Sequence, residues 1–348
     1  MEQKIPVGIL GATGSVGQKF MQLLQDHPWF EVVALCASDK NTGKPYGQAV
    51  NWFQNEPCPA VFMDMRLEAC QPTLPCRLVF SGLDSSVAGE IESEFARAGY
   101  AVISNSRNHR MDEDVPLVVP EVNPDHLDLV LQQAGPGMIV TNPNCSTIGM
   151  VLALKPLWDA FGIDAVQVVT LQALSGAGYP GVSSLDILDN VVPFISGEEG
   201  KMESEPLKLF GKLDGGKIDM ATMRISAQCN RVAVQDGHLE RVSVKLARSA
   251  TMEEIRYAIE SFQPAIWDLD LPSSPAQCIH LFDDPLSPQP RKHHKLGNGM
   301  TVSVGHLSEC PVLDVKFSVL VHNTVRGAAG GALLNAELMA AKGMLNAL

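Results

Sequence analysis

A glycine-rich loop between an apolar strand and an amphipathic helix is the feature that most limits the fold of this chain. The run IPVGIL (5–10) leads into GATGSVGQ, and KFMQLLQDHPWF follows with Phe20, Leu23, Leu24 and His27 at helical spacing. The next segment, EVVALCAS, is an apolar run typical of a buried strand. Strand, glycine loop, helix and strand in this order predict a βαβ unit, which belongs in a parallel sheet covered by helices.

The βαβ pattern continues through about the first 144 residues. RLVFSG and YAVISN are predicted parallel strands with a helix at IESEFARAG between them, and LVVPEVN (117–123) and GMIVTNPN (137–144) extend the series. We therefore predict an α/β fold that begins with a Rossmann-like, doubly wound dinucleotide-binding domain over residues 1–144.

From residue 145 the hydrophobic pattern changes to period two. IDAVQVVTLQAL, QCNRVAVQD, LERVSVKLAR, MTVSVGHLSE and PVLDVKFSVLVHN alternate apolar and polar residues, which is typical of half-buried strands. We predict an α+β domain with a mixed sheet over residues 145–323. The tail at 324–348 is rich in small residues and is predicted to form a helix that completes the first domain.

Charge and cysteine usage exclude several classes of protein. The net charge of −13 argues against a nucleic-acid partner or an anionic membrane surface. The eight cysteines include no C-x-x-C pair, so we expect reduced thiols and no metal site. MEQKIPVGILGATG contains no signal-peptide core, and no apolar run approaches the ~18–20 residues of a membrane span. We expect a soluble cytoplasmic protein with a small-molecule substrate.

The glycine loop predicts a binding site for the pyrophosphate of a dinucleotide. Gly11, Gly14 and Gly17 follow a strand and open a helix, where backbone N–H groups can closely approach a phosphate. Thr13 and Ser15 add hydroxyl groups. A tight structural turn that binds no ligand is the alternative interpretation of the same glycines.

The end of the second strand bears on the choice between NADP and NAD. An NAD site usually has an acidic residue here for the ribose 2′-hydroxyl group. In ASDKNTGK, Asp39 is surrounded by Ser38, Lys40, Thr42 and Lys44. Hydroxyl and ammonium groups suit a 2′-phosphate, so we predict NADP, with NAD or an ordinary solvated loop as alternatives.

Cys145 in TNPNCSTIG is a candidate nucleophile. STIGMVLALKPLW predicts a helix that begins at or just after it, a position that lowers a thiol pKa and offers N–H groups to an oxyanion. A small buried apolar side chain is the alternative. A nucleophilic thiol also needs a base. Of nine histidines His238 stands out, because it follows a glycine where a strand turns and Arg231 lies seven residues upstream.

Together these motifs resemble the aspartate-β-semialdehyde dehydrogenase family, and most closely its archaeal and fungal branch. The similarity covers essentially the whole chain. The motifs that carry it, in chain order, are GATGSVG (11–17), ASDKNTGKPY (37–46), SNSRNHRMDEDVPLVVPEVN (104–123), TNPNCSTI (141–148), LQALSGAGYPG (171–181), DNVVPFISGEEGKMESEPLKLFGK (189–212), CNRVAVQDGH (229–238) and HNTVRGAAGGALLNAEL (322–338).

The resemblance implies NADP-dependent reductive dephosphorylation of L-4-aspartyl phosphate to L-aspartate 4-semialdehyde, a reversible step in lysine, threonine, methionine and isoleucine biosynthesis. In that pattern Cys145 carries an acyl thioester and His238 is the general acid and base. Gln172 orients the acyl intermediate. The resemblance also implies that residues 145–323 form the catalytic and dimerisation domain, through which a homodimer or homotetramer assembles.

The resemblance further implies substrate and cofactor residues. Arg231 is expected to bind the substrate α-carboxylate through its guanidinium fork. Glu205 is expected to meet the ammonium group and Lys208 the phosphate, although without the family they look like an exposed i,i+3 helix pair. The other expected substrate residues are Arg110, Asn108 and Asn144. The expected cofactor residues are Gly11, Thr13, Gly14, Ser15, Val16, Ser38, Lys40, Thr42, Ser81, Ser175, Gly176 and Asn323.

Two segments depart from the family pattern, and other functions remain open. His238 is followed by LER in place of a segment that starts with Ser or Thr, and the loop at 196–204 is strongly acidic. The closest alternative is malonyl-CoA reductase of the same family, which has no use for an ammonium partner such as Glu205. N-acetyl-glutamyl-phosphate reductase fits the motifs less well. A non-catalytic NADP-binding sensor would not need both Cys145 and His238.

Overall fold

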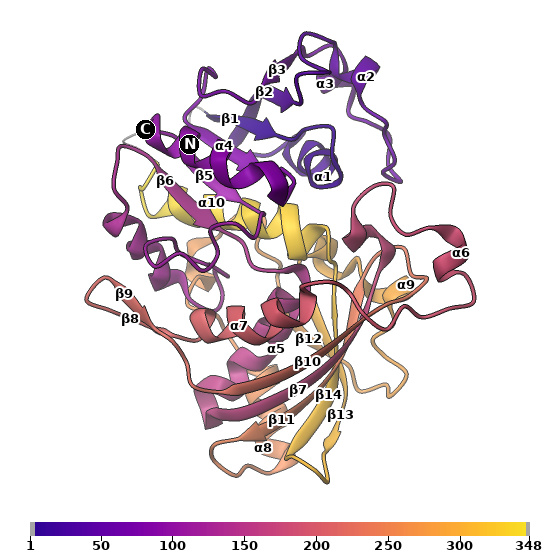
Figure 1. Ribbon diagram of the computed structural model, residues 1–348. Coiled ribbons are helices and arrows are strands. Elements are labelled where there is room, and N and C mark those ends of the chain that lie inside the picture. Colours follow the sequence, from indigo (N-terminus) through magenta and orange to yellow (C-terminus); the bar gives the residue numbers. More distant parts are fainter. Residues whose placement is uncertain (1–3, 346–348) are drawn as a thin grey trace.

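The glycine loop follows the first strand of a six-stranded parallel sheet, in a computed structural model that describes residues 4–345 (Figure 1). The strands lie in the order β3-β2-β1-β4-β5-β6, and each pair of neighbours is parallel. This order is that of the Rossmann fold, in which ligands bind where the order reverses, beside β1. The strands are β1 (Ile5–Leu10), β2 (Phe30–Ala37), β3 (Leu67–Ala69), β4 (Leu78–Ser81), β5 (Ala101–Ser104) and β6 (Met138–Thr141).

Helices connect the strands of this sheet. The longest are α1 (Ser15–Leu24), which starts directly at the glycine loop, and α4 (Ser85–Arg97), which connects β4 to β5. His27, predicted on the first helix, lies beyond its end. The shorter elements of this half are α2 (Tyr46–Ala49), α3 (Ala60–Met63) and the 3-10 helix η1 (Pro124–Gln132).

A mixed six-stranded sheet forms the second half of the molecule. Its order is β10-β7-β11-β14-β13-β12; the two outer strands run parallel to their neighbours and the inner pairs are antiparallel. The strands are β7 (Ile163–Gln172), β10 (Arg224–Arg231), β11 (His238–Leu246), β12 (Ile279–Leu281), β13 (Val302–Glu309) and β14 (Val315–Val321). The predicted fold class, a Rossmann-like sheet followed by a mixed sheet, is thus confirmed.

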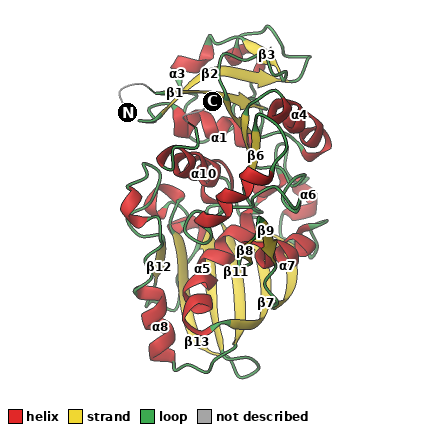
Figure 2. Ribbon diagram, turned by 90° about the vertical axis from the view of Figure 1, so that its left-hand side faces the viewer, coloured by secondary structure: helices red, strands yellow, loops and turns green. Residues whose placement is uncertain are grey.

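One face of the mixed sheet is covered by helices α5 (Cys145–Phe161), α7 (Glu198–Leu209) and α8 (Met252–Glu260), which lie in front of the strands in Figure 2. The start of α5 therefore lies between the two sheets. The remaining elements are the hairpin of β8 (Lys212–Asp214) and β9 (Lys217–Asp219), and the short helices η2 (Leu174–Ala177), α6 (Ser184–Ile187), η3 (Trp267–Leu269), α9 (Pro290–His293) and η4 (Leu296–Gly299).

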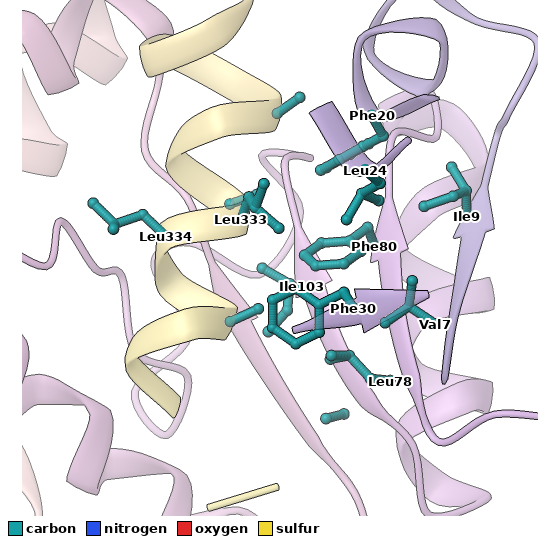
Figure 3. Close-up of a cluster of buried hydrophobic side chains, with 14 of the residues drawn as sticks. Val7, Ile9, Phe20, Leu24, Phe30, Leu78, Phe80, Ile103, Leu333 and Leu334 are labelled. Atoms are coloured by element: carbon teal, nitrogen blue, oxygen red, sulfur yellow. The ribbon is translucent and has the colours of Figure 1, made fainter. Parts of the chain in front are cut away.

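The last helix, α10 (Gly330–Ala341), packs back onto the first sheet after a π-helical turn, η5 (Val325–Ala329). In Figure 3 Leu333 points from α10 toward Phe80 and Ile103, while Leu334 lies on the opposite side of the helix. Both leucines are buried, so α10 fills the space between the domains. The domain boundaries at residues 144 and 323 remain predictions. Residues 1–3 of the first predicted domain and 346–348 of the predicted C-terminal helix lie outside the described residues.

The prediction of a strand at residues 117–123 is wrong. Only Leu117 makes a bridge, to Thr141, and the chain then turns away from the sheet. Pro116 and Pro120 supply no N–H group to a ladder, which disfavours a central strand. The segment buries Glu121 instead, whose carboxylate accepts two hydrogen bonds from the Arg326 guanidinium.

Between residues 4 and 345, no helix combines the length and the apolar character that crossing a membrane requires.

Candidate active site

Helix α5 begins at the candidate nucleophile. Asn144 is the N-cap, and its Oδ1 accepts hydrogen bonds from the backbone N–H groups of Ser146 (3.0 Å) and Thr147 (3.3 Å). An Asn side chain at this position satisfies N–H groups that the first turn leaves without a helical partner. The sequence NPNC therefore fixes Cys145 as the first residue of the helix, as predicted.

A single cleft of about 660 Å³ runs from the glycine loop to this thiol. Ten of the predicted site residues line it: Thr13, Gly14, Ser15, Val16, Arg110, Asn144, Cys145, Ser175, Gly176 and Asn323. They come from both halves of the molecule, so the cleft joins the predicted nucleotide site to the predicted reaction site.

The thiol and the predicted base lie in direct contact. The Sγ atom of Cys145 is 3.2 Å from Nε2 of His238, which opens β11. The other ring nitrogen, Nδ1, accepts the backbone N–H of Ala173 at 3.0 Å. An imidazole nitrogen that accepts a hydrogen bond carries no hydrogen, so the neutral His238 ring has its hydrogen on Nε2, facing sulfur. Gly176 allows this close approach, because a Cβ there would lie 2.9 Å from the ring.

The surroundings keep the thiol and the imidazole neutral. Burial, followed by the nearby Glu198 carboxylate, raises the pKa of the Cys145 thiol to about 12, against the smaller opposing effects of Arg110, Arg231 and Lys201. Burial, followed by the Arg231 charge, lowers the pKa of His238 to about 3. Burial thus opposes the lowering of the thiol pKa that is expected at a helix start.

These pKa shifts predict how Cys145 reacts with iodoacetamide. Because its pKa is about 12, the thiolate fraction and the alkylation rate rise about tenfold per pH unit from pH 7 to 10 without a plateau. Glu198→Gln removes a negative charge that raises this pKa, so the rate at any such pH increases. Mass spectrometry of the Cys145 peptide measures the rate. A plateau near pH 8 in the unmodified protein would contradict the prediction.

Glu198 was not among the predicted residues, yet it occupies the centre of the site. Its Oε2 accepts hydrogen bonds from Asn144 Nδ2 (2.8 Å) and Gln172 Nε2 (3.4 Å), and its Oε1 from Lys201 Nζ (2.5 Å). Glu198 and Lys201 line the cleft, and so does Arg107. The acidic loop at 196–204, noted only as a departure from the family pattern, was the signal that could have identified Glu198 and Lys201.

Two further predicted residues flank the thiol from the second domain. The buried Arg231 guanidinium donates to the carbonyl of Ala173 at 2.7 Å, and a Cβ on Gly176 would lie 2.9 Å from its Nη1. Asn323 connects two loops, since its Oδ1 accepts the Gly237 N–H at 2.9 Å and its Nδ2 donates to Ser175 Oγ at 2.8 Å. Arg231 and Asn323 are thus held beside Gly176 and Ser175 of the cleft.

The structure does not bring Glu205 and Lys208 into the cleft. Both side chains are buried, so they are not an exposed helix pair either. The Lys208 ammonium donates to the carbonyls of Arg110 (2.9 Å), Asp112 (2.7 Å) and Val115 (2.7 Å). These three acceptors use all three donors of an ammonium group, so Lys208 is not available to a phosphate in this arrangement.

The predicted nucleotide residues divide into two groups. Gly11 has φ +77°, a conformation that favours glycine, and a Cβ on Gly17 would lie 2.3 Å from the Gly11 carbonyl oxygen. No side chain caps the N-terminus of α1, which leaves its N–H groups facing the cleft that Thr13, Gly14, Ser15 and Val16 line. This cradle fits a pyrophosphate.

Four other predicted cofactor residues and one predicted substrate residue, Asn108, do not line the cleft. Ser38, Lys40 and Thr42 lie in the turns after β2 and do not line it. Ser81 is buried at the end of β4, one residue before Gly82 of the cleft. Asn108 is exposed and donates to the Ser85 carbonyl at 3.0 Å.

Two aromatic rings stack in the wall of the cleft. Phe53 and Tyr179 stack with ring centroids 4.9 Å apart, and both line the cleft. Across residues 4–345, no group of three or more His, Cys, Asp or Glu side chains has an arrangement suited to a metal ion.

Comparisons with known proteins find semialdehyde dehydrogenases over nearly the whole chain. Residues 6–130 match the family model of the semialdehyde dehydrogenase NAD binding domain, and residues 154–326 match that of the semialdehyde dehydrogenase dimerisation domain. An aspartate-semialdehyde dehydrogenase of Archaeoglobus fulgidus is 51% identical over 96% of this chain and 97% of its own length. One of Schizosaccharomyces pombe is 48% identical over 97% of this chain and 99% of its own.

The solved structures that resemble this chain are also aspartate semialdehyde dehydrogenases. The aspartate semialdehyde dehydrogenase of Candida albicans with NADP superposes with a TM-score of 0.91 at 45% identity, covering 98% of this chain and 100% of that one. The aspartate semialdehyde dehydrogenase II of Vibrio cholerae complexed with ASA superposes with a TM-score of 0.77 at 27% identity, covering 97% and 98%. The similarity therefore extends over the nucleotide half and the thiol half alike.

Proposed function

This chain belongs to the aspartate-semialdehyde dehydrogenase family, and we propose that it interconverts L-4-aspartyl phosphate and L-aspartate 4-semialdehyde with NADP as cofactor. One observation carries the proposal: a single cleft connects the glycine loop at α1 with the contact between Cys145 and His238. A hydride carrier and a covalent nucleophile must act on the same carbon in this reaction, and the cleft gives both access to one substrate.

The residues that hold the cofactor in this proposal are the glycine loop and the loop of Ser175 and Gly176. The loop of Gly11 to Ser15 binds the pyrophosphate at the start of α1. Asn323, Ser175 and Gly176 flank the nicotinamide end, next to the thiol. When bound there, NADPH would supply the hydride for reduction, and NADP⁺ would accept it in the reverse direction.

Cys145 is the acyl carrier in the proposed mechanism. In the biosynthetic direction its sulfur attacks the acyl carbon, the C–O bond to phosphate breaks, and a thioester remains on the enzyme. The thiol proton leaves to solvent before the attack, because Nε2 of His238, 3.2 Å from sulfur, already carries the ring hydrogen. His238 therefore acts at the reacting centre from the donor side, as the general acid. Its N–H also stabilises negative charge on sulfur as the thiolate leaves. Gln172, held by Glu198 at 3.4 Å, orients the acyl group.

The charges in the cleft support a substrate with two anionic ends and one ammonium group. Helix α7 contains two Glu-x-x-Lys pairs seven residues apart, Glu198/Lys201 and Glu205/Lys208, and only the first pair lines the cleft. We assign the ammonium partner to Glu198 and the phosphate to Lys201 with Arg110. Arg231 remains the partner of the α-carboxylate, through the guanidinium fork.

Replacing each lysine in turn by methionine tests the assignment of the phosphate to Lys201. Lys201→Met removes a cation from the cleft and is expected to raise the KM for phosphate in the oxidative direction about ten- to hundredfold, the range for a lost charged hydrogen bond. Lys208→Met is the matched variant on the same helix and is expected to raise this KM less. Initial rates at varied phosphate measure both. A larger increase in Lys208→Met would restore the family-derived assignment.

The activity itself is tested by NADP reduction with aspartate semialdehyde and phosphate. Phosphate-dependent turnover supports the proposal, and with it a step in the biosynthesis of lysine, threonine, methionine and isoleucine. Absence of turnover would overturn it, and NADPH oxidation with malonyl-CoA then tests the alternative reductase. Since the second half matches a dimerisation domain, we also propose a homo-oligomer built through it, which light scattering measures.

A further inference from the structure

We infer that Glu205 is a positioning residue, which fixes the phosphate-binding Arg110 relative to Cys145 and does not itself contact the substrate. The inference rests on the proposed function, because it assigns a role within that site. It replaces the family-derived expectation that Glu205 meets the substrate ammonium group.

The contacts of Glu205 use both of its carboxylate oxygens. Oε1 accepts a hydrogen bond from Arg110 Nη1 at 2.8 Å, and Oε2 accepts one from the backbone N–H of Asn144 at 2.7 Å. The residue is 2% exposed and does not line the cleft. A carboxylate that is already bound on both oxygens and closed off from the cleft is suited to holding protein groups, not a substrate.

The two groups that Glu205 joins lie in segments that follow two different strands of the first sheet. Arg110 lies in the segment after β5, and Asn144 follows β6 and directly precedes Cys145. Phosphate leaves the acyl carbon that sulfur attacks, so the distance between the phosphate cation and the sulfur must match the length of an acyl phosphate. Among residues 4–345, Glu205 from α7 is the side chain that hydrogen-bonds both to Arg110 and to Asn144, the residue before Cys145.

The rest of the Arg110 environment supports this role. Its Nη2 donates to the Asn105 carbonyl at 2.8 Å, and Lys208 holds the Arg110 carbonyl at 2.9 Å. Within the described residues the buried Nε of Arg110 has no hydrogen-bond partner. The guanidinium of Arg110, which lines the cleft, is therefore held in a fixed orientation by protein groups. Its Nη1 and Nη2 each keep a second hydrogen that a phosphate oxygen can accept.

Glu205→Gln tests the inference, with Glu203→Gln as the matched control. A glutamine has one acceptor oxygen, so it can serve Arg110 or Asn144 but turns an NH₂ group toward the other donor. Glu203 lies on the same helix and accepts the backbone N–H of Ala227 at 3.1 Å, but it contacts neither Arg110 nor Asn144. Loss of a helix–backbone contact as such should therefore affect both variants equally.

A positioning role has a specific kinetic signature. Glu205→Gln is expected to lower kcat and raise the KM for phosphate, with kcat/KM for phosphate reduced about ten- to hundredfold, as expected for a small misplacement of reacting groups. The KM for aspartate semialdehyde should stay within about twofold, and Glu203→Gln should match the unmodified protein. In an Arg110→Ala background, Glu205→Gln should no longer change the KM for phosphate.

Other outcomes would overturn the inference. An increase confined to the KM for aspartate semialdehyde would make Glu205 a substrate-binding residue, and equal losses in both glutamine variants would make it merely structural. The alkylation rate of Cys145 needs no substrate and is expected to change in Glu205→Gln but not in Glu203→Gln. An unchanged rate counts against the inference even if the protein shows no phosphate-dependent turnover, whereas that missing turnover alone counts against the proposed function.

Discussion

Cys145→Ser is expected to reduce phosphate-dependent NADP reduction by about 10⁴-fold, because a serine hydroxyl in this neutral, buried setting is a far weaker nucleophile than the thiol. The thiol lies 3.2 Å from His238 and at the end of the cleft that starts at the glycine loop. The substitution exchanges one atom, so circular dichroism and the melting temperature should be unchanged.

A phosphate-free reaction separates the nucleophile from other causes of inactivity. With aspartate semialdehyde and NADP alone, the unmodified protein should form one equivalent of NADPH and gain the mass of an acyl group on the Cys145 peptide. Cys145→Ser should do neither, and Cys310→Ser, in the turn after β13, should behave like the unmodified protein. Turnover in Cys145→Ser within tenfold of normal would exclude the thioester mechanism.

His238→Ala is expected to lower kcat by about 10²- to 10⁴-fold, the usual contribution of a general acid–base residue. Its Nε2 faces sulfur, and its Nδ1 is fixed by the Ala173 N–H at 3.0 Å. Because the pKa of the ring is about 3, the imidazolium forms only below the working pH range. Any decrease of kcat as the pH falls from 7 to 5 should therefore reflect the protonation of a group other than His238.

His238→Gln distinguishes proton transfer from hydrogen bonding. A glutamine amide can donate to sulfur but cannot exchange a proton, so it should lose nearly as much activity as alanine if proton transfer dominates. Activity of His238→Gln close to normal would reduce the role of His238 to a hydrogen-bond donor. His280→Gln, on β12 at the far edge of the mixed sheet, is the control and should retain full activity.

Local patterns in the sequence were enough to predict the framework of the fold. The glycine loop, α1 and β2 follow from residues adjacent in the chain, and so does the start of α5 at Cys145, which a single Asn cap determines. The segment at 117–123 was predicted incorrectly because its apolar residues are buried against other elements without forming a ladder. Apolar character reports burial and does not by itself report hydrogen bonding.

The register of α7 could not be predicted in this way. Glu198/Lys201 and Glu205/Lys208 have the same spacing and lie seven residues apart, so both pairs lie on nearly the same face of the helix. Which pair faces the cleft depends on where α7 crosses the start of α5, a contact between residues more than 50 positions apart. The pKa of the thiol likewise depends on Glu198, whose position only the tertiary structure reveals.

The return of α10 to the first sheet has a consequence for synthesis of the chain on the ribosome. Phe20, Phe30 and Phe80 share their apolar cluster with Leu333 and Leu338. At translation rates of about 5–20 residues per second, roughly 10–40 s separate completion of the first sheet from the appearance of the helix that covers it. During that interval the nascent nucleotide half exposes an apolar surface, which makes it a natural client for chaperones that bind such surfaces.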